Sequence, residues 1–392
     1  MKRNLVLLTI CQALAFGGTA LVASSSALVG VSLAPSVSLA TLPMSVQFLA
    51  VMLTTFPASM LMKRVGRRTG FALGAGAGIA GALTSTLGIM TGSFVLFCLG
   101  AAGIGILGGF AQYYRLAAAD AVEAKQRGPA ISWVLTGGVA GAFLGPILAA
   151  WTHAGSDTPF ARTYAALAGV YGISLLFILL IRADDHAAEE VTGKERPLST
   201  ILRQPLFVMA VVAAMLGFSI MTLVMTSTPL AMQAHAQSFD RIAVVIQWHL
   251  VAMFAPSFFS GHLIRRFGAR NIIIVGIVLD SVCVVINLAG TDLMNFWSSL
   301  VVLGIGWNFL YTGGSTLLTE TYLPAERARI QGIHSLFVFI PVTLVSLGSG
   351  VLHYYFGWRG VNMSVVPLIA MVLTAVWWCY REEPPSPARG SA

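Results

Sequence analysis

The chain has 392 residues, of which 57% are hydrophobic and only 10% are charged, with a formal net charge of +8 and a mean hydropathy of +0.82. Soluble domains carry about 25% charged residues. The composition therefore excludes a water-soluble globular protein, a disordered chain and a disulfide-rich secreted module. The apolar runs are continuous and lack the two-residue alternation of a membrane β-barrel. We expect an all-α membrane protein.

The apolar runs predict twelve membrane-spanning helices, because one span needs about 20 mostly apolar residues. In chain order the runs cover residues 5–31, 38–62, 70–90, 94–118, 130–151, 163–181, 205–228, 241–264, 271–290, 296–318, 332–353 and 361–380. The first run is longer than the roughly 7–15-residue core of a cleaved secretion signal, so we expect it to remain as the first span.

Lysine and arginine gather in alternate loops. With a cytoplasmic N-terminus, 19 of the 23 basic residues lie on the cytoplasmic side and Arg115 lies within a span. Cytoplasmic loops are enriched in these residues, so the bias predicts two cytoplasmic termini in a multi-pass protein of a bacterial inner membrane. The short basic clusters between apolar runs do not form a nucleic-acid-binding patch.

The chain repeats itself weakly at half its length. Residues 38–57 align with residues 238–256, which places Gln47 on Gln247, and the loop 64–68 aligns with the loop 266–270. Parallel repeats are typical of transporters whose site lies between the halves. We expect an N-terminal six-helix half over 1–182, a cytoplasmic linker over 183–204, a C-terminal half over 205–380 and a cytoplasmic tail over 381–392.

The loop after the second span carries a family resemblance. Arg64, Gly66 and Arg68 match the signature Gly-x-x-x-Asp-Arg-x-Gly-Arg-Arg, with Ser59 in place of the glycine and Lys63 in place of the acid. With this loop and twelve spans in two halves, the whole chain resembles the major facilitator superfamily. The resemblance implies a secondary active transporter that moves a small organic solute by alternating access, coupled to protons.

The second copy of the loop keeps Arg266 and Gly268 but has Arg265 at the acidic position. A latch built on a carboxylate at that position is therefore in doubt in both halves. Asp120 and Glu320, which follow the fourth and tenth spans at an offset of 200 residues, are alternative acids for gating.

The direction of transport stays open. Gly141, Gly145 and Pro146 in the fifth span resemble part of a motif of the family's exporters, although packing through small residues also explains them. Residues 226–232 and 306–310 resemble a proteobacterial subgroup in which some members take up riboflavin. Vitamin uptake and export of drugs or metabolites are both compatible with the sequence.

Polar side chains recur on one face of the first, fourth, seventh and tenth spans, which in the resembled family line the central cavity. Polar stripes in apolar helices require a hydrogen-bonded or wet surface. The candidate cavity residues, together with the matched glutamines of the second and eighth spans, are Gln12, Thr19, Gln112, Arg115, Thr222, Asn308, Tyr311, Gln47 and Gln247.

Two charges within spans are the sharpest functional candidates, because a charge at the bilayer centre costs about 2.5–3.5 kcal/mol on insertion scales. Arg115 is a candidate for anion binding or gating, with snorkelling to the interface as the alternative. Asp280 is a candidate proton carrier, with a neutral acid hydrogen-bonded between helices as the alternative.

Other classes of function find little support. The sequence contains neither a nucleotide-binding loop nor a His-Glu-x-x-His metal motif, and its four cysteines lie far apart. We expect no cofactor and no metal, and a monomer whose partners are a small-molecule substrate and the lipid bilayer. A channel and a membrane-embedded enzyme are the rival classes.

Overall fold

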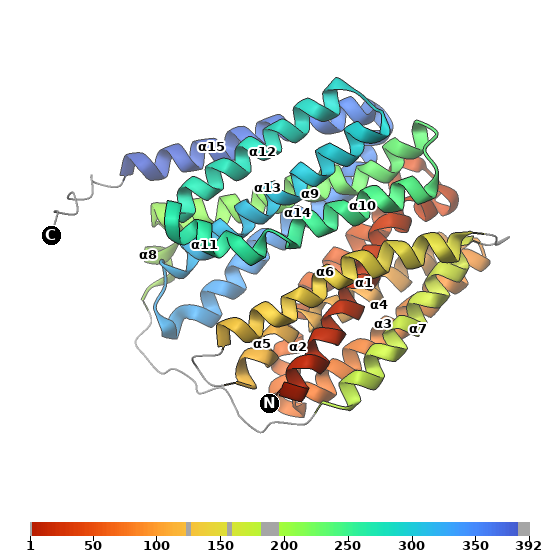
Figure 1. Cartoon of the computed structure of the whole chain (residues 1–392), viewed down its shortest axis with the longest axis horizontal. Helices are drawn as coiled ribbons and strands as arrows, with labels where there is room; N and C mark the ends of the chain where they lie inside the picture. Colours follow the sequence, from red (N-terminus) through yellow and green to blue (C-terminus); the bar gives the residue numbers. More distant parts are fainter. Residues whose placement is uncertain (1, 123–126, 155–158, 182–195, 383–392) are drawn as a thin grey trace.

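The computed structural model describes residues 2–122, 127–154, 159–181 and 196–382, which are helical almost throughout (Figure 1). A 3₁₀ turn, η1 (Val37–Leu39), precedes the second span, and the fourth span consists of two helices, α4 and α5. The N-terminal half contains α1 (Lys2–Leu33), α2 (Leu42–Val65), α3 (Arg67–Met90), α4 (Phe94–Ala111), α5 (Tyr114–Asp120), α6 (Arg127–His153) and α7 (Pro159–Leu179).

The C-terminal half is preceded by a short helix, α8 (Leu198–Leu202), and its eighth span also consists of two helices, α10 and α11. A second 3₁₀ turn, η3 (Pro324–Glu326), leads into the last two spans. The remaining helices are α9 (Pro205–Ala234), α10 (Phe239–Phe254), α11 (Ser257–Phe267), α12 (Ala269–Ala289), α13 (Leu293–Thr319), α14 (Arg327–Met363) and α15 (Val365–Glu382).

Two breaks decide how many times the described chain crosses the membrane. The stretch Arg329–Arg381 has 53 residues, and a straight helix of that length would measure roughly 80 Å, against a hydrocarbon core of about 30 Å. The chain reverses at Gly357, where φ is 63° and ψ is −168°. The stretch therefore counts as two spans, whereas α10 and α11 count as one span bent by 42°. The described residues thus make twelve crossings, and the predicted all-α fold is confirmed.

The two basic loops share one backbone conformation. Gly66 (φ 82°, ψ 156°) ends α2 and begins α3, and Gly268 (φ 84°, ψ 147°) ends α11 and begins α12. A side chain would be strained at this positive φ. The structure therefore repeats the same sharp turn in both halves.

The two halves meet through two pairs of helices. The helix α2 packs against α14, and α6 packs against α10, while α1 also touches α9 and α10. In Figure 1 the N-terminal half lies below the C-terminal half, and the start of α1 and the end of α15 lie at the same end of the molecule.

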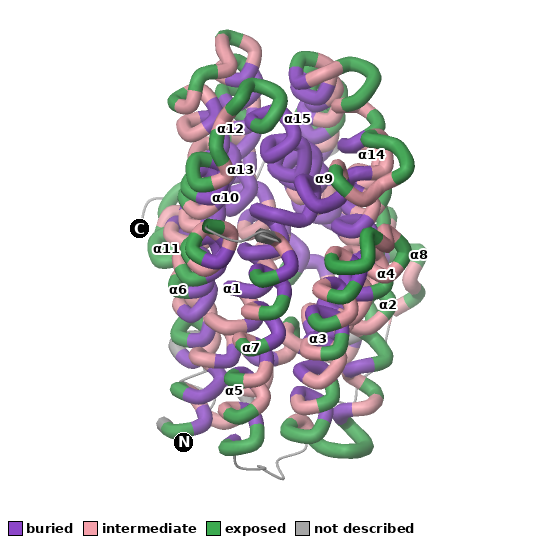
Figure 2. Tube along the Cα trace, turned by 90° about the vertical axis from the view of Figure 1, so that its right-hand side faces the viewer, coloured by how far each residue is buried: buried purple, intermediate pink, exposed green. Residues whose placement is uncertain are grey.

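The halves are sealed at the opposite end, which we call the closed end. Residues 20–30 of α1 and residues 219–232 of α9 are buried without interruption, and Figure 2 shows buried segments running through both helices. A helix at a surface keeps an exposed face, so these stretches lie inside the contact between the halves. We call the other end, where α1 begins and α15 ends, the terminal end. There α11 has one buried residue, Ser260.

A hydroxyl group joins the halves at the closed end. The Thr41 Oγ1 donates to the Leu347 carbonyl (3.4 Å) and accepts from the Gly350 N–H (3.2 Å). A Cβ atom on Gly350 would stand 2.6 Å from this Oγ1 and 2.9 Å from the Ser38 carbonyl oxygen. The approach of α14 to η1 and α2 therefore requires glycine at position 350.

We expect Gly350→Ala to weaken the closed end, because the added methyl group displaces Thr41 or Ser38. Overpacking costs about 1–3 kcal/mol, and about 1.4 kcal/mol changes an equilibrium tenfold. Maleimide labelling of a cysteine placed at the buried Ala27 should therefore become roughly tenfold faster. The matched control is Gly348→Ala, where an added Cβ meets nothing within 4 Å. Equal labelling rates in both variants would show that Gly350 is not needed for the packing of the closed end.

Candidate substrate site

Aromatic side chains from five helices gather near the middle of the molecule, and we call them the aromatic cluster. Each lies close to the midpoint of its span, which is the depth at which transporters with parallel repeats bind substrate. The members are Phe16 on α1, Phe218 on α9, Phe254 on α10, Trp307 and Tyr311 on α13, and Phe339 on α14.

The rings of Trp307 and Tyr311 are stacked one turn apart on α13, with centroids 5.1 Å apart and planes at 7°. Phe218 meets both rings edge-on, at 5.5 and 5.9 Å. Phe254 lies 6.1 Å from Trp307 and also contacts Phe16 of the other half at 4.5 Å. These are the favoured geometries of aromatic pairs, so the cluster has the chemistry to bind a flat ring and touches both halves.

Unpaired polar atoms lie beside these rings. The Trp307 Nε1 and the Thr222 Oγ1 are buried and have no hydrogen-bond partner among the described residues, and Thr222 follows Phe218 by one helical turn. Buried polar groups are normally paired. A ligand with hydrogen-bonding atoms at its ring edge would satisfy both groups.

Several predicted cavity residues lie near the cluster. Tyr311 belongs to it, and Gln12 is half-buried one turn before Phe16. The Thr19 hydroxyl donates to the Ala15 carbonyl of its own helix (3.3 Å). The sequence offers no signal that selects Phe16, Phe218 and Phe254 among its 22 phenylalanines.

The matched glutamines lie at different contacts between the helices. Gln47 is buried on α2, which packs against α4 and α14, and its Oε1 has no partner within the described chain. Gln247 is half-buried on α10, which packs against α13 and α6. The structure does not bring the two amides together. Asn308 is 2% exposed and bonds across to the eighth span.

Arg115 lies apart from the aromatic cluster. It is half-buried on α5, a helix that packs against α1 and α6 of its own half, and its buried Nε lacks a partner among the described residues. Gln112 is exposed at the break between α4 and α5. The side chain of Asp120 lies outside the described residues.

Asp280 lies behind the cluster. It is 1% exposed on α12, and neither of its oxygens has a partner in the described part of the chain. A Cβ atom on Gly306 of α13 would collide with its Oδ1. Since Trp307 follows Gly306, the carboxyl group lies against the part of α13 from which Trp307 projects.

The predicted gating residues lie at the terminal end. Glu320 and the loop residues Arg64, Gly66, Arg68, Arg266 and Gly268 are exposed there. Over the described ranges, no three His, Cys, Asp or Glu side chains are placed to hold a metal ion.

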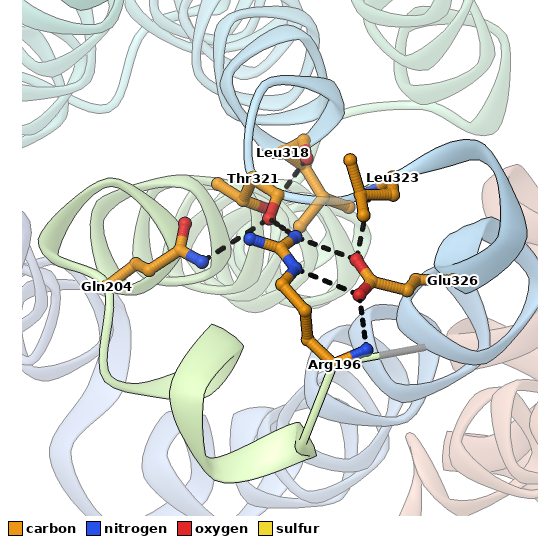
Figure 3. Close-up of polar contacts among 6 residues, drawn as sticks. All are labelled: Arg196, Gln204, Leu318, Thr321, Leu323 and Glu326. Atoms are coloured by element: carbon orange, nitrogen blue, oxygen red, sulfur yellow. Dashed lines mark hydrogen bonds and ion pairs between the residues drawn. The ribbon is translucent and has the colours of Figure 1, made fainter. Parts of the chain in front are cut away.

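An ion pair also lies at this end (Figure 3). The Arg196 Nη2 and Nε contact the Glu326 carboxylate at 2.7 and 2.9 Å, and the Arg196 backbone N–H donates to the same carboxylate at 2.8 Å. The Arg196 guanidinium also donates to the Thr321 carbonyl (2.9 Å), and the Leu323 N–H donates to Glu326 (2.8 Å). The partners are 130 residues apart, so sequence spacing gives no signal for this pair.

The ion pair changes the titration of both groups. Hydrogen bonding from Arg196, supported by the Leu323 N–H, lowers the pKa of Glu326 to about 2, and the same pairing raises the pKa of Arg196. The carboxylate is therefore ionised at every physiological pH. Its contribution to stability is present above its ordinary pKa and is lost only as the pH falls toward the lowered value.

We expect Glu326→Gln to lower the melting temperature in detergent, because a neutral amide replaces the carboxylate beside the guanidinium. The loss should be equal at about pH 5.5 and about pH 8, since the native group does not titrate between them. Glu320→Gln, at an exposed acid nearby, is the control and should leave the melting temperature unchanged. A loss that shrinks toward about pH 5.5 would show that the pKa is not lowered.

Comparisons with known proteins agree with this architecture. A family model described as the Major Facilitator Superfamily matches residues 8–255 and 223–392. The chain is 41% identical to the riboflavin transporter RfnT of Brucella anthropi, covering 95% of this chain and 94% of that protein. It is 27% identical to the uncharacterized MFS-type transporter YddS of Bacillus subtilis, covering 81% of this chain and 77% of that one.

A solved structure shows the same fold. The crystal structure of a bacterial homologue of the human lysosomal transporter Spinster, in an inward-facing and unoccupied conformation, superposes with a TM-score of 0.73 at 15% identity, covering 96% of each chain. The family match spans nearly the whole sequence, and the two sets of six spans and the paired turns agree with it. This chain is a multi-pass membrane transporter that belongs to the major facilitator superfamily.

Proposed function

We propose that the protein takes up riboflavin, or a closely similar flat heterocycle, across a bacterial plasma membrane. The observation that carries the proposal is the aromatic cluster, with the unpaired Trp307 Nε1 and Thr222 Oγ1 beside it. The ring system of riboflavin is flat and presents hydrogen-bond acceptors at its edge. The identity of 41% with a riboflavin transporter supports the same substrate class.

The described conformation fits one step of alternating access. With both termini cytoplasmic, as the distribution of basic residues favours, the closed end faces outward and substrate leaves toward the cytoplasm. Loading from outside then requires the contacts of Thr41 with α14 to separate. One chain contains both halves and the site between them, so a monomer suffices.

The exporter-like glycines have a packing role in this structure. A Cβ on Gly141 would lie 2.5 Å from the Ala13 carbonyl oxygen and 2.7 Å from the Gly17 nitrogen. Gly145 also packs against Gly17, and both contacts let α6 approach α1 closely. The glycine spacing is therefore explained by helix packing and is no argument for export.

We expect Trp307→Ala to weaken riboflavin binding roughly tenfold or more, because stacking a base on an aromatic ring contributes about 1–3 kcal/mol. Quenching of riboflavin fluorescence by the purified protein measures the dissociation constant. Trp307→Phe keeps a ring and removes the N–H, so its dissociation constant should lie between those of the native protein and Trp307→Ala. Trp151→Ala, at a 71% exposed residue on α6, is the control. Failure of the native protein to bind riboflavin would refute the proposed substrate.

We also propose that uptake is coupled to protons through Asp280, an unpaired acid deep within a span. Asp280→Asn keeps the shape of the side chain but cannot titrate. In proteoliposomes this variant should lose most of the uptake driven by a pH gradient while still binding riboflavin. Asp292→Asn, at an exposed acid before α13, is the matched control. Full gradient-driven uptake by Asp280→Asn would remove Asp280 from coupling.

A further inference from the structure

We propose that Asn308 is a positioning residue that holds the bend of the eighth span and thereby the wall of the site formed by Phe254 and Trp307. This inference rests on the proposed function, since it deepens the account of the same site. The sequence suggests Asn308 as a cavity residue in contact with substrate. The structure shows both N–H groups of its amide bonded to the eighth span, while its buried Oδ1 has no partner among the described residues.

The bend begins where the helical hydrogen bonds stop. The helix α10 ends at Phe254 and α11 begins at Ser257, with Pro256 between them and an angle of 42°. Proline has no N–H to donate to the carbonyl four residues earlier. Beyond Ser257, the N–H groups of Phe258 and Phe259 donate three residues back, at 3.3 and 3.0 Å. Pro256 thus leaves the Ala252 carbonyl without its helical donor and interrupts the regular hydrogen bonding at the bend.

Asn308 bonds to the chain on both sides of the bend. Its Nδ2 donates to the Met253 carbonyl of α10 and to the Ser257 Oγ of α11, at 2.7 Å each. A primary amide has two N–H donors, and both are used here. Because one bond ends on each helix, the amide fixes α11 relative to α10.

The Asn308 amide is the last of three contacts, spaced four residues apart on α13, that this helix makes with the eighth span. The His249 Nδ1 bonds to the Leu300 carbonyl at 2.7 Å. Four residues later, a Cβ on Gly304 would lie 2.6 Å from the His249 carbonyl oxygen. Asn308 follows after four more residues. The first two contacts reach α10 alone, whereas the contact of Asn308 crosses the bend.

The bend bears directly on the substrate site. Phe254 is the last residue of α10, its ring centroid lies 6.1 Å from that of Trp307, the neighbour of Asn308, and it also forms a ring contact with Phe16 of the N-terminal half. The helix α11 also touches α12 and α13, but Ser260 is its one buried residue. Releasing the bend would therefore move Phe254, and with it the ring contact that joins the halves.

The first measurement needs no substrate. Spin labels at Val244 of α10 and His262 of α11, both exposed, report the bend as a distance between the two helices. We expect a single narrow distance in the native protein and a broadened distribution in Asn308→Ala. Ser257→Ala, which removes only the bond to α11, should also broaden it. Thr316→Ala, whose hydroxyl bonds within α13, should not. An unchanged distribution in both Asn308→Ala and Ser257→Ala would overturn the proposal.

The second measurement separates positioning from stability. In Asn308→Ala combined with Pro256→Ala, the new N–H restores the helical bonds and straightens the span. This double variant should recover the melting temperature that Asn308→Ala loses, and give a longer single distance. Its riboflavin affinity should stay about tenfold below native. Recovery of affinity together with stability would show that Asn308 acts on stability alone.

The two measurements also separate this inference from the proposed substrate. If Asn308→Ala loses affinity with an unchanged label distance, Asn308 contacts the substrate directly and the positioning role is wrong. If the native protein binds no riboflavin, the proposed substrate fails, while the label distances and melting temperatures still decide whether Asn308 holds the bend.

Discussion

The hydrocarbon core of a membrane offers no water, so every backbone N–H and C=O group must find its partner inside the protein. Helices meet this requirement along most of the described chain, and at two places a side chain supplies a further partner to the backbone. At the bend of the eighth span, the amide of Asn308 donates to the Met253 carbonyl at the end of α10. At the closed end, the Thr41 hydroxyl bonds to backbone groups of α14. These polar contacts therefore mark where the helices bend and where the halves meet.

Hydrophobic association is weak between helices surrounded by lipid, so close packing through small residues brings them together. The two halves use the same device. A Cβ on Gly105 of α4 would collide with the Gln47 carbonyl oxygen of α2, and one on Gly304 of α13 would crowd the His249 carbonyl of α10. The repeat seen in the sequence is thus also a repeat of helix contacts. The halves differ one turn later, where Gly109 packs against the unbroken α2 but Asn308 binds the bend.

Most of the fold could be predicted from the sequence, because span length, apolar runs and basic loops are local signals. Fewer residues of the candidate site could be predicted. Tyr311 and Thr222 follow from polar spacing on one helix face, but the selection of Phe16 and Phe254 depends on how the halves approach each other. The pairing of Arg196 with Glu326 depends on a contact over 130 residues. In each case a side chain acquires its role from a distant helix, which no local pattern encodes.

The strength of the contacts differs within and between the halves. The ion pair of Arg196 with Glu326 joins the segment before α8 to the C-terminal half, so it need not break when the halves move. The Asn308 amide likewise joins two spans of one half. Between the halves, beside the buried packing of α1 against α9, the polar and ring contacts include one hydroxyl group, the edge-on rings of Phe16 and Phe254, and the tilted rings of His153 and Phe239. Conformations exchange readily only when they differ by a few kcal/mol. Stiff halves joined by weak contacts satisfy that condition. A ligand that binds the aromatic cluster more tightly in one conformation would then shift the equilibrium toward that conformation.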